Sequence, residues 1–407
     1  MRCLKSVITT NNEMKYMLKT NSFTFIFFLI FSHFAILDTL ADEAIQKESP
    51  TSSAKPILIG TNYFAGWWKP LPNKWVVAGK DWREKYPGRV PLLGQYNEQE
   101  TMDSEIIAAS EHGVDFFLIL WYFNGIDNKA ERGEQNARFL NVAVDQFMAS
   151  PNANRMQFAV EYCNHEPFQI KEQAEWDWAI KTWVKAMKHP NYLRVGGKPL
   201  FKVHSWHHYW FENGENFDQC MARMQQLRQA ARDTGLGEIL IGGGIGSYQP
   251  IPVAEGRIPK LFDFTATYME LPLDLPPREG NAYHPYDTLA EYMRGSRQVH
   301  GEDALPYLPY FGLNFNAEPW GDQRSRFEFP TREQLKREFQ LLKTDLENAK
   351  LNLGVPLDNG TLQKMFTIYA WNEFGEGGFL APTVEEQTMK LEVLKEVFGA
   401  EKKSKSP

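Results

Sequence analysis

Two carboxylates near the C-terminal end of the sequence have the spacing of a catalytic pair. Glu373 and Glu376 lie in the segment TIYAWNEFGEGG, residues 367–378, directly after an apolar run that ends at Trp371. Two close carboxylates repel each other, which raises the pKa of one of them and holds it protonated near neutral pH. Cleavage of a glycosidic bond requires such a proton donor and a second group that acts on the sugar. We interpret the pair as catalytic, with solvated loop acids or a cation site as the alternatives.

Aromatic, amide, acidic and histidine side chains recur directly after the short apolar runs of the chain. Aromatic rings offer flat apolar faces on which a sugar ring stacks, while acids and amides hydrogen-bond to hydroxyl groups. Packing in an aromatic core is the alternative for each tryptophan, since the chain contains 12 Trp and is 14% aromatic. The residues that we expect to contact a sugar substrate are Tyr63, Trp67, Trp68, Trp121, Tyr122, Glu161, Asn164, His204, Trp206, His207, Tyr268, Trp320, Trp371 and Asn372.

Two members of this set allow more than one interpretation. His204 opens the segment HSWHH, whose histidines could hold a metal ion, but the adjacent His207 and His208 cannot easily face one ion together with His204. We expect substrate hydrogen bonding or packing there, and neither a metal nor a cofactor. Glu161 either holds a sugar hydroxyl or pairs with Lys202 on the neighbouring strand.

Short apolar runs, rich in β-branched and aromatic residues, alternate with stretches of helical periodicity along the chain. We expect strands at residues 57–63, 114–122, 156–162, 199–204, 239–243, 262–268, 305–313 and 365–371. We expect helices at 98–112, 134–149, 173–188, 217–235, 286–297, 331–349 and 383–398, with a capping box at Thr331 and Gln334. Continuous apolar runs are typical of buried parallel strands. The pattern predicts an α/β fold, a single-domain (β/α)8 barrel over residues 56–399, with its site at the C-terminal ends of the strands.

The two ends of the sequence differ in composition from this domain. Basic residues precede an apolar run at residues 23–37, and a small-x-small cleavage site follows at residues 39–41, so residues 1–41 are predicted to be a signal peptide. An uncleaved anchor is the alternative. Residues 42–55 are predicted to be a polar linker and residues 400–407 a disordered tail. The mature chain is therefore expected to be exported (periplasmic, secreted or attached to the surface), with no membrane span.

Charge and cysteine content restrict the partners further. The net charge of −7, without a basic stripe, argues against nucleic acid, because phosphates require basic side chains. Cys163 and Cys220, the cysteines that follow the leader, have the spacing of neither a disulfide framework nor a zinc site. We expect a monomer that acts on an oligosaccharide or polysaccharide.

The closing motif resembles a known family signature. Residues 371–377 (WNEFGEG) and 380–382 (LAP) are similar to the WNEWxEGxxLEP signature of the glycoside hydrolase family 99-like (WbsX-type) proteins, which are related to endo-α-mannosidases and endomannanases. Residues 189–201, 107–121 and the first apolar run also resemble family segments, so the similarity extends over about residues 57–395. It implies a retaining enzyme that forms a 1,2-anhydro-sugar intermediate, with Glu373 acting on the sugar 2-hydroxyl and Glu376 as general acid/base.

The sequence departs from the family pattern near the expected sugar contacts. Phe374 stands where the family has Trp, Ala381 where it has Glu, and residues 162–165 read YCNH where relatives read Trp-Ala-Asn-Glu. The two carboxylates are kept. We therefore expect an exported retaining hydrolase of α-linked glycans of the mannose type or a related type. A catalytically silent sugar-binding relative and a WbsX-type glycosyltransferase-associated protein are the alternatives, the latter disfavoured by the export signal.

Overall fold

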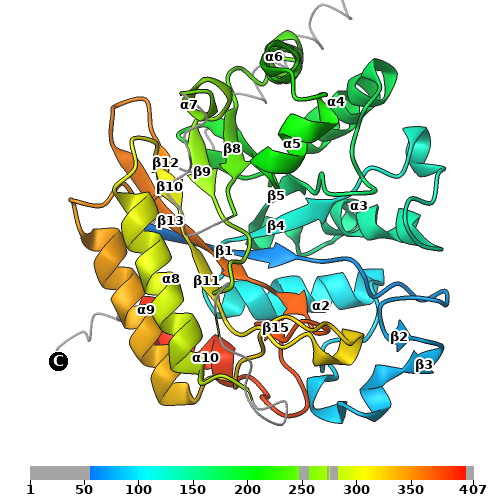
Figure 1. Cartoon of the computed structure of the whole chain (residues 1–407), viewed down its shortest axis with the longest axis vertical. Coiled ribbons are helices and arrows are strands. Elements are labelled where there is room, and N and C mark those ends of the chain that lie inside the picture. Colours follow the sequence, from blue (N-terminus) through cyan, green and yellow to red (C-terminus); the bar gives the residue numbers. More distant parts are fainter. Residues whose placement is uncertain (1–55, 247–255, 273–274, 276–282, 400–407) are drawn as a thin grey trace, which may run out of the picture. The chain divides into compact units, whose positions relative to one another are not determined.

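The computed structural model describes residues 56–246, 256–272, 275 and 283–399, which include a ring of parallel strands surrounded by helices (Figure 1). The predicted leader, linker and tail, residues 1–41, 42–55 and 400–407, lie outside the described residues. The strands of the ring are β1 (Ile57–Tyr63), β4 (Phe116–Trp121), β5 (Gln157–Tyr162), β7 (Lys198–Val203), β8 (Leu240–Gly244), β9 (Phe264–Ala266), β10 (Tyr307–Leu308), β11 (Tyr310–Gly312) and β13 (Leu362–Tyr369).

Strand pairing closes this sheet into a barrel. β1 pairs with β4 on one side and β13 on the other, and the order continues through β5, β7, β8 and β9 with parallel pairings throughout. β10 pairs with β9 and β11 pairs with β13, so these two short strands, on either side of Pro309, share one position and join the two edges. The predicted (β/α)8 barrel is confirmed.

Burial explains why the strands read as continuous apolar runs. Every residue of β4 (FFLILW) is buried, because one face points into the barrel and the other packs under the helices. Most strand ends differ from the prediction by one or two residues, and two strands differ more. β9 is shorter than residues 262–268, and β13 begins at Leu362 and ends at Tyr369. Trp371 therefore belongs to the segment that follows the last strand.

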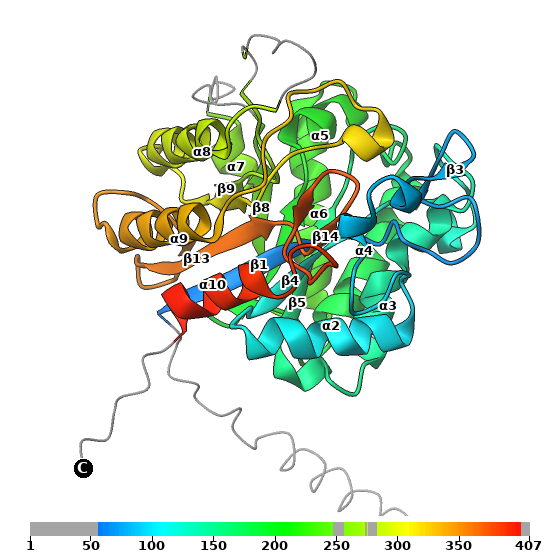
Figure 2. The ribbon, with the colours of Figure 1, turned by 90° about the horizontal axis from the view of Figure 1, so that it is seen from below.

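The helices cover the outside of the barrel (Figures 1 and 2). The predicted segment 134–149 divides into a 3-10 turn at Ala137–Asn141 and a shorter α-helix. The last helix begins at Met389 rather than residue 383, because the backbone around Val384 hydrogen-bonds to the segment 88–92 instead of continuing a helix. The capping box of Thr331 and Gln334 is confirmed. The helices are α2 (Gln99–Glu111), α3 (Val142–Ala149), α4 (Gln173–Met187), α5 (Trp206–Glu212), α6 (Phe217–Asp233), α7 (Ile258–Leu261), α8 (Tyr286–Gly301), α9 (Arg332–Glu347) and α10 (Met389–Phe398).

Short antiparallel strand pairs lie next to the barrel strands or in the segments that connect them. β14 (Asn372–Glu373) and β15 (Gly378–Phe379) form a hairpin directly after β13, and this hairpin carries the predicted acid pair. β2 (Val76–Val77) and β3 (Lys80–Asp81) form a second hairpin in the long segment between β1 and α2. β6 (Arg194–Val195) precedes β7, and β12 (Val355–Pro356) pairs with β13.

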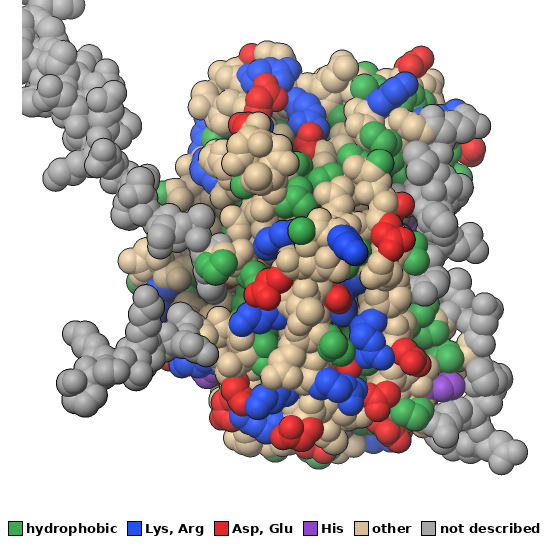
Figure 3. All heavy atoms as spheres, turned by 90° about the vertical axis from the view of Figure 1, so that its left-hand side faces the viewer, with side chains coloured by type: hydrophobic (Ala, Val, Ile, Leu, Met, Phe, Trp, Pro, Cys, Tyr) green, Lys and Arg blue, Asp and Glu red, His purple; other side chains and the backbone are tan. Residues whose placement is uncertain are grey.

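The face over α8 and α9 mixes acidic and basic side chains (Figure 3). Ion pairs join neighbouring helices there, with Arg337 bonded to Asp287 of α8 and Lys336 lying 2.5 Å from Glu396 of α10. Such exposed pairs contribute little to stability individually. Among the described residues, no helix has the length and apolar character needed to cross a membrane.

Candidate active site

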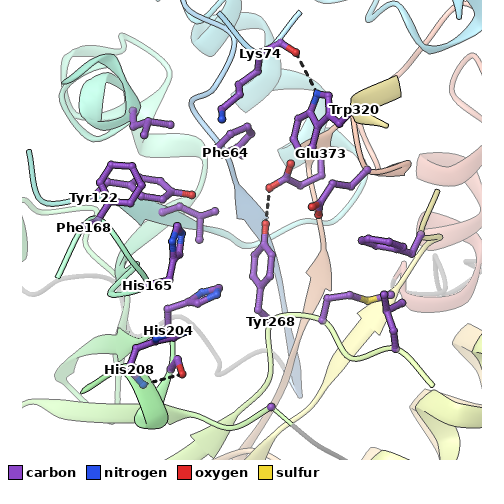
Figure 4. A pocket seen from close by; sticks show the side chains of 18 of the residues that line it. Phe64, Lys74, Tyr122, His165, Phe168, His204, His208, Tyr268, Trp320 and Glu373 are labelled. Carbon is purple, nitrogen blue, oxygen red and sulfur yellow. Dashed lines mark hydrogen bonds between the residues drawn. The ribbon is translucent and has the colours of Figure 1, made fainter. Parts of the chain in front are cut away.

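A cavity of about 600 Å³ opens at the C-terminal ends of the barrel strands. Catalytic sites of this architecture lie at that end, because the loops that follow the strands converge there. Figure 4 shows Tyr122, His165, His204 and His208 on one side of the cavity and Trp320 with Glu373 on the other. The predicted residues that line it are Tyr122, His204, Tyr268, Trp320, Glu373 and Glu376.

The β14–β15 hairpin brings the two acids to the cavity wall. Gly377 has φ of +80°, a backbone conformation that residues with a side chain rarely adopt. A Cβ atom on Gly375 would lie 2.1 Å from the Trp320 ring, so glycine is required there for close packing. The group that approaches the backbone at Gly375 is thus an aromatic side chain of the protein itself.

Glu373 is held almost entirely out of solvent, with an exposed fraction of 5%. Its Oε1 atom accepts a hydrogen bond of 2.6 Å from the Tyr268 hydroxyl, and its Oε2 atom has no partner among the described residues. Burial and then the charge of Glu376 raise the pKa of Glu373 well above its usual range, against the opposing effect of the Tyr268 hydrogen bond. Glu373 therefore favours the protonated form in the unliganded protein.

Glu376 has a more polar environment on the same hairpin. The Tyr369 hydroxyl donates a hydrogen bond to Oε2, and Nη2 of Arg324 lies 3.4 Å from Oε1. Burial raises the pKa of Glu376, while Tyr369 and Arg324 act in the opposite direction. The two carboxyl groups interact electrostatically, so their protonation steps belong to the pair rather than to either residue alone.

A buried ionic network lies below the cavity and supports His204. Glu161 Oε1 is 2.5 Å from Lys202 Nζ and 2.7 Å from His204 Nδ1, and its Oε2 accepts a 2.9 Å hydrogen bond from Asn62. Burial alone would raise the pKa of Glu161, but Lys202 first and His204 second reverse the effect and lower it. Glu161 does not line the cavity, so of its two interpretations the structure shows the pairing with Lys202. His204 reaches the cavity from this network.

The remaining histidines form one wall of the cavity. Burial is the main cause that lowers the pKa of His165, to about 4, and that of His208 is lowered for the same reason. Both imidazoles are therefore neutral near pH 7 and can donate or accept hydrogen bonds. No group of three or more histidine, cysteine or acidic side chains with the arrangement needed for a metal ion occurs among the described residues.

Several predicted contact residues lie elsewhere, and the alternation of strands explains the clearest case. Leu120 and Tyr122 line the cavity, so Trp121 between them points away from it toward the helices. Tyr63 donates a 2.7 Å hydrogen bond to buried Glu105, and Trp371 is fully buried in the core. We correct the expectation that these three residues line the sugar-binding cavity.

Trp67 and Asn372 pack behind the acid pair instead of facing the cavity. We had expected Trp67 and Glu161 to converge with His204 and Glu373 on one cavity, and only His204 and Glu373 line it. The ring centroids of Trp67 and Phe374 are 5.4 Å apart, and the indole N–H of Trp67 donates a 2.9 Å hydrogen bond to the Asn372 carbonyl. The Asn372 side chain bonds to both backbone groups of Phe64, at 2.8 Å each. These residues tie the hairpin to the segment after β1.

The other predicted residues have local structural roles. Trp68 is buried and donates to the Pro72 carbonyl, and Asn164 exchanges hydrogen bonds with the Ser205 backbone. Trp206 packs against Trp210, and His207 is exposed beside Phe211. Trp206 and His207 follow the end of a strand as expected, but helix α5 begins at Trp206 and directs both side chains away from the cavity.

Long loops supply cavity residues that sequence reasoning missed. Lys74, from the segment between β1 and α2, forms a 2.7 Å ion pair with Glu134, and its positive charge opposes the rise in the Glu373 pKa. Arg324 and Phe64 also line the cavity. Phe64 directly follows a predicted strand and could have been found by that signal, whereas nothing in the sequence pattern marks Lys74 or Arg324.

The barrel and the buried acid pair at its C-terminal mouth together have the architecture of glycoside hydrolases. No family model matches the chain, and no curated protein matches it. Among solved structures, a glycoside hydrolase-like protein is similar, with a TM-score of 0.56 and 18% identity over 84% of this chain and 94% of that one. The family 99 endo-α-mannosidase from Bacteroides thetaiotaomicron is similar with a TM-score of 0.51 and 14% identity, covering 84% of this chain and 95% of that one. The expected resemblance to family 99 is confirmed at the level of the fold.

Proposed function

We propose that this protein is a family 99-like glycoside hydrolase that cleaves α-linked glycans of the mannose type or a related type, with retention of configuration. The observation that carries the proposal is the buried, interacting pair Glu373 and Glu376 in the wall of the barrel-mouth cavity. The motif resemblance and the shared fold support the family and the substrate class. A cavity of about 600 Å³ lies within the usual range for small-molecule sites, roughly 300–1,000 Å³.

The proposed reaction uses the pair in two roles. Glu376 donates its proton to the departing glycosidic oxygen, and Glu373 removes the proton of the sugar 2-hydroxyl. The 2-oxygen then attacks C1 from the opposite face, the C1–oxygen bond breaks, and a 1,2-anhydro sugar forms. Water opens this ring at C1 after Glu376 has taken its proton, while Glu373 returns a proton to the 2-oxygen. Two inversions at C1 give overall retention.

In the unliganded protein the proton is favoured on Glu373, whereas the proposed reaction requires it on Glu376. Arg324 accounts for part of this difference. Glu373 has the more strongly raised pKa, whereas Arg324 and Tyr369 stabilise the ionised form of Glu376. The Arg324 side chain is 55% exposed and is also bonded to Asp322 at 2.7 Å. We propose that a bound sugar displaces Arg324 from Glu376, so that Glu376 takes the proton and Glu373 ionises.

The two carboxylates can be tested by substitution with two classes of substrate. Glu376→Gln should abolish turnover of substrates with poor leaving groups and retain more activity on aryl glycosides, whose leaving groups need no proton. Glu373→Gln should impair both classes, because the 2-hydroxyl must react whatever the leaving group. A 2-deoxy substrate should bind without reacting. Equal losses everywhere, or full activity on the 2-deoxy sugar, would contradict these roles.

We also propose that residues 1–41 direct export and that the mature chain is monomeric. The support is the basic, apolar and small-residue order of the leader. Expression of the full chain and N-terminal sequencing of the exported product should locate cleavage after residue 41. Light scattering should give the mass of one chain. A product that keeps the leader would support the anchor, and a product that stays inside the cell would contradict export.

A further inference from the structure

A second cavity lies on the other side of β4 from the acid pair. It has a volume of about 310 Å³ and is lined by three tryptophans, Trp121, Trp178 and Trp183, from β4 and α4. The period-two alternation of β4 separates the two cavities, because Leu120 and Tyr122 face the first and Trp121 faces the second. Nothing in the proposed reaction uses this second cavity.

We propose that the second cavity is a binding site for one glycosyl residue of the substrate glycan, separate from the catalytic site. The proposal rests on the proposed function, because the ligand is part of the same glycan. Its apolar walls are indole rings. The ring centroids of Trp121 and Trp178 are 6.2 Å apart, and the angle between the two ring planes is 33°. Trp178 is only half-buried, so its surface is open to an entering ring. Tryptophan combines a large flat apolar face with a polar N–H, which suits a sugar ring.

Polar groups in the wall supply partners for hydroxyl groups. Asp127 and Asp145 are exposed at the rim, and the amide side chains of Asn128 and Asn141 lie beside them. The indole N–H of Trp183 is buried and has no hydrogen-bond partner in the part of the chain that the structure describes. A buried donor without a partner is uncommon in a native structure. The second cavity thus combines stacking faces with the carboxylate acceptors of Asp127 and Asp145.

An ammonium ligand is the chemical alternative to a neutral sugar in the second cavity. Aromatic cages also bind quaternary ammonium groups, so this alternative is chemically distinct and testable. Asp127 is already paired with Lys129 at 2.8 Å, which places a positive charge at the rim. Because Asp145 adds a second carboxylate to the rim, a cationic competitor in the binding test distinguishes the two ligands.

The second cavity shares a loop with the catalytic site. The Asn141 side chain accepts a 2.7 Å hydrogen bond from the Tyr122 backbone and donates one of 2.5 Å back to its carbonyl. Glu134 from the same segment lines the catalytic cavity. A glycan polymer that binds in the second cavity is therefore held close to the acid pair. This raises the effective concentration of the polymer at the catalytic site.

The test uses Trp178→Ala, with Trp210→Ala, another half-buried tryptophan outside both cavities, as the matched control. Both are made in a Glu376→Gln background, and mobility is measured in native gels that contain soluble α-mannan. Trp178→Ala should weaken mannan binding by on the order of tenfold, about 1.4 kcal/mol, while Trp210→Ala should not. Tetramethylammonium serves as the competing probe.

Turnover separates failure of this inference from failure of the proposed function. In otherwise unchanged protein, Trp178→Ala should keep its kcat/KM on a small aryl α-mannoside and lose activity on mannan. Equal mannan binding by Trp178→Ala and the control, or displacement of mannan by tetramethylammonium, overturns the second site while turnover upholds the hydrolase. Absence of turnover on every α-linked glycan overturns the proposed function instead, whatever the gels show.

Discussion

His204 Nδ1 lies 2.7 Å from Oε1 of Glu161, a carboxylate with no exposed surface. The same oxygen lies 2.5 Å from Lys202, which is also buried. Three ionisable groups thus share one hydrogen-bonded centre below the cavity floor, and the imidazole is the member that reaches the cavity. The orientation of His204 toward a substrate therefore depends on a carboxylate that no substrate touches.

Glu161→Gln should destabilise the fold, because it leaves the Lys202 ammonium buried without a counter-charge. Breaking a buried pair by removing one partner costs about 3–5 kcal/mol. Urea unfolding at pH 7 measures the change, and Glu166→Gln, whose partner Lys171 is exposed, is the control and should have little effect. A loss as small as that of the control would show that the network does not stabilise the fold.

The same network predicts a dependence of stability on pH. The folded-state pKa of Glu161 is lowered, so its contribution is present above the pKa of the unfolded chain, about 4.3, and is lost as the pH falls through the folded value. The wild type should therefore lose more stability than Glu161→Gln between about pH 5 and pH 2. Urea midpoints across this range test it, and parallel curves for the two proteins would contradict it.

Arg324→Gln should move the acidic limb of the pH–rate profile to higher pH, because Glu376 has the less strongly raised pKa of the pair in the unliganded protein and loses its proton first. The guanidinium lowers the pKa of Glu376, so its removal keeps the proposed general acid protonated at higher pH. The measurement is kcat/KM against pH on a substrate with a poor leaving group. An acidic limb that stays in place or moves to lower pH would show that Arg324 does not control the pKa of Glu376.

Tyr268→Phe should move the alkaline limb to higher pH and lower the rate, because Glu373 is the group of the pair that loses its proton last in the unliganded protein. The Tyr268 hydroxyl donates to Glu373 and lowers its pKa, so its loss raises that pKa further and reduces the ionised fraction of the proposed base. A hydrogen bond to a charged group contributes about 1.5–3 kcal/mol, which corresponds to roughly a tenfold to hundredfold loss in kcat/KM. Tyr369→Phe is the comparison and should act on the acidic limb, because Tyr369 donates to Glu376.

Gly375→Ala should impair activity without unfolding the protein. The added Cβ would lie 2.1 Å from the Trp320 ring, and the φ of Gly375 is not in the left-handed region, so the clash alone is introduced. Turnover and thermal unfolding are measured together. Adding Trp320→Ala should relieve the clash, so the double variant should differ little from Trp320→Ala alone. A Gly375→Ala protein as active as the wild type would show that the hairpin adapts freely.

The sequence by itself determined the barrel and the acid pair, for physical reasons that are local. Buried parallel strands are mostly apolar along their length, so β4 (FFLILW) was visible as a continuous apolar run. Glu373 and Glu376 directly follow such a run, and the C-terminal ends of barrel strands meet at one mouth. Their position in the cavity followed from topology without knowledge of any contact.

Only the tertiary structure decided which aromatic residues face the cavity. Trp121 and Tyr122 are neighbours in the chain, yet the alternation of the strand sends them to different cavities. Trp67 and Phe374 pack together behind the hairpin although more than 300 residues separate them, and Lys74 and Arg324 enter the cavity from long loops. Such placements depend on side-chain packing between distant segments, which no local pattern encodes. The chain thus specified its acid pair locally, while the shape of the cavity arose only when the loops packed around that pair.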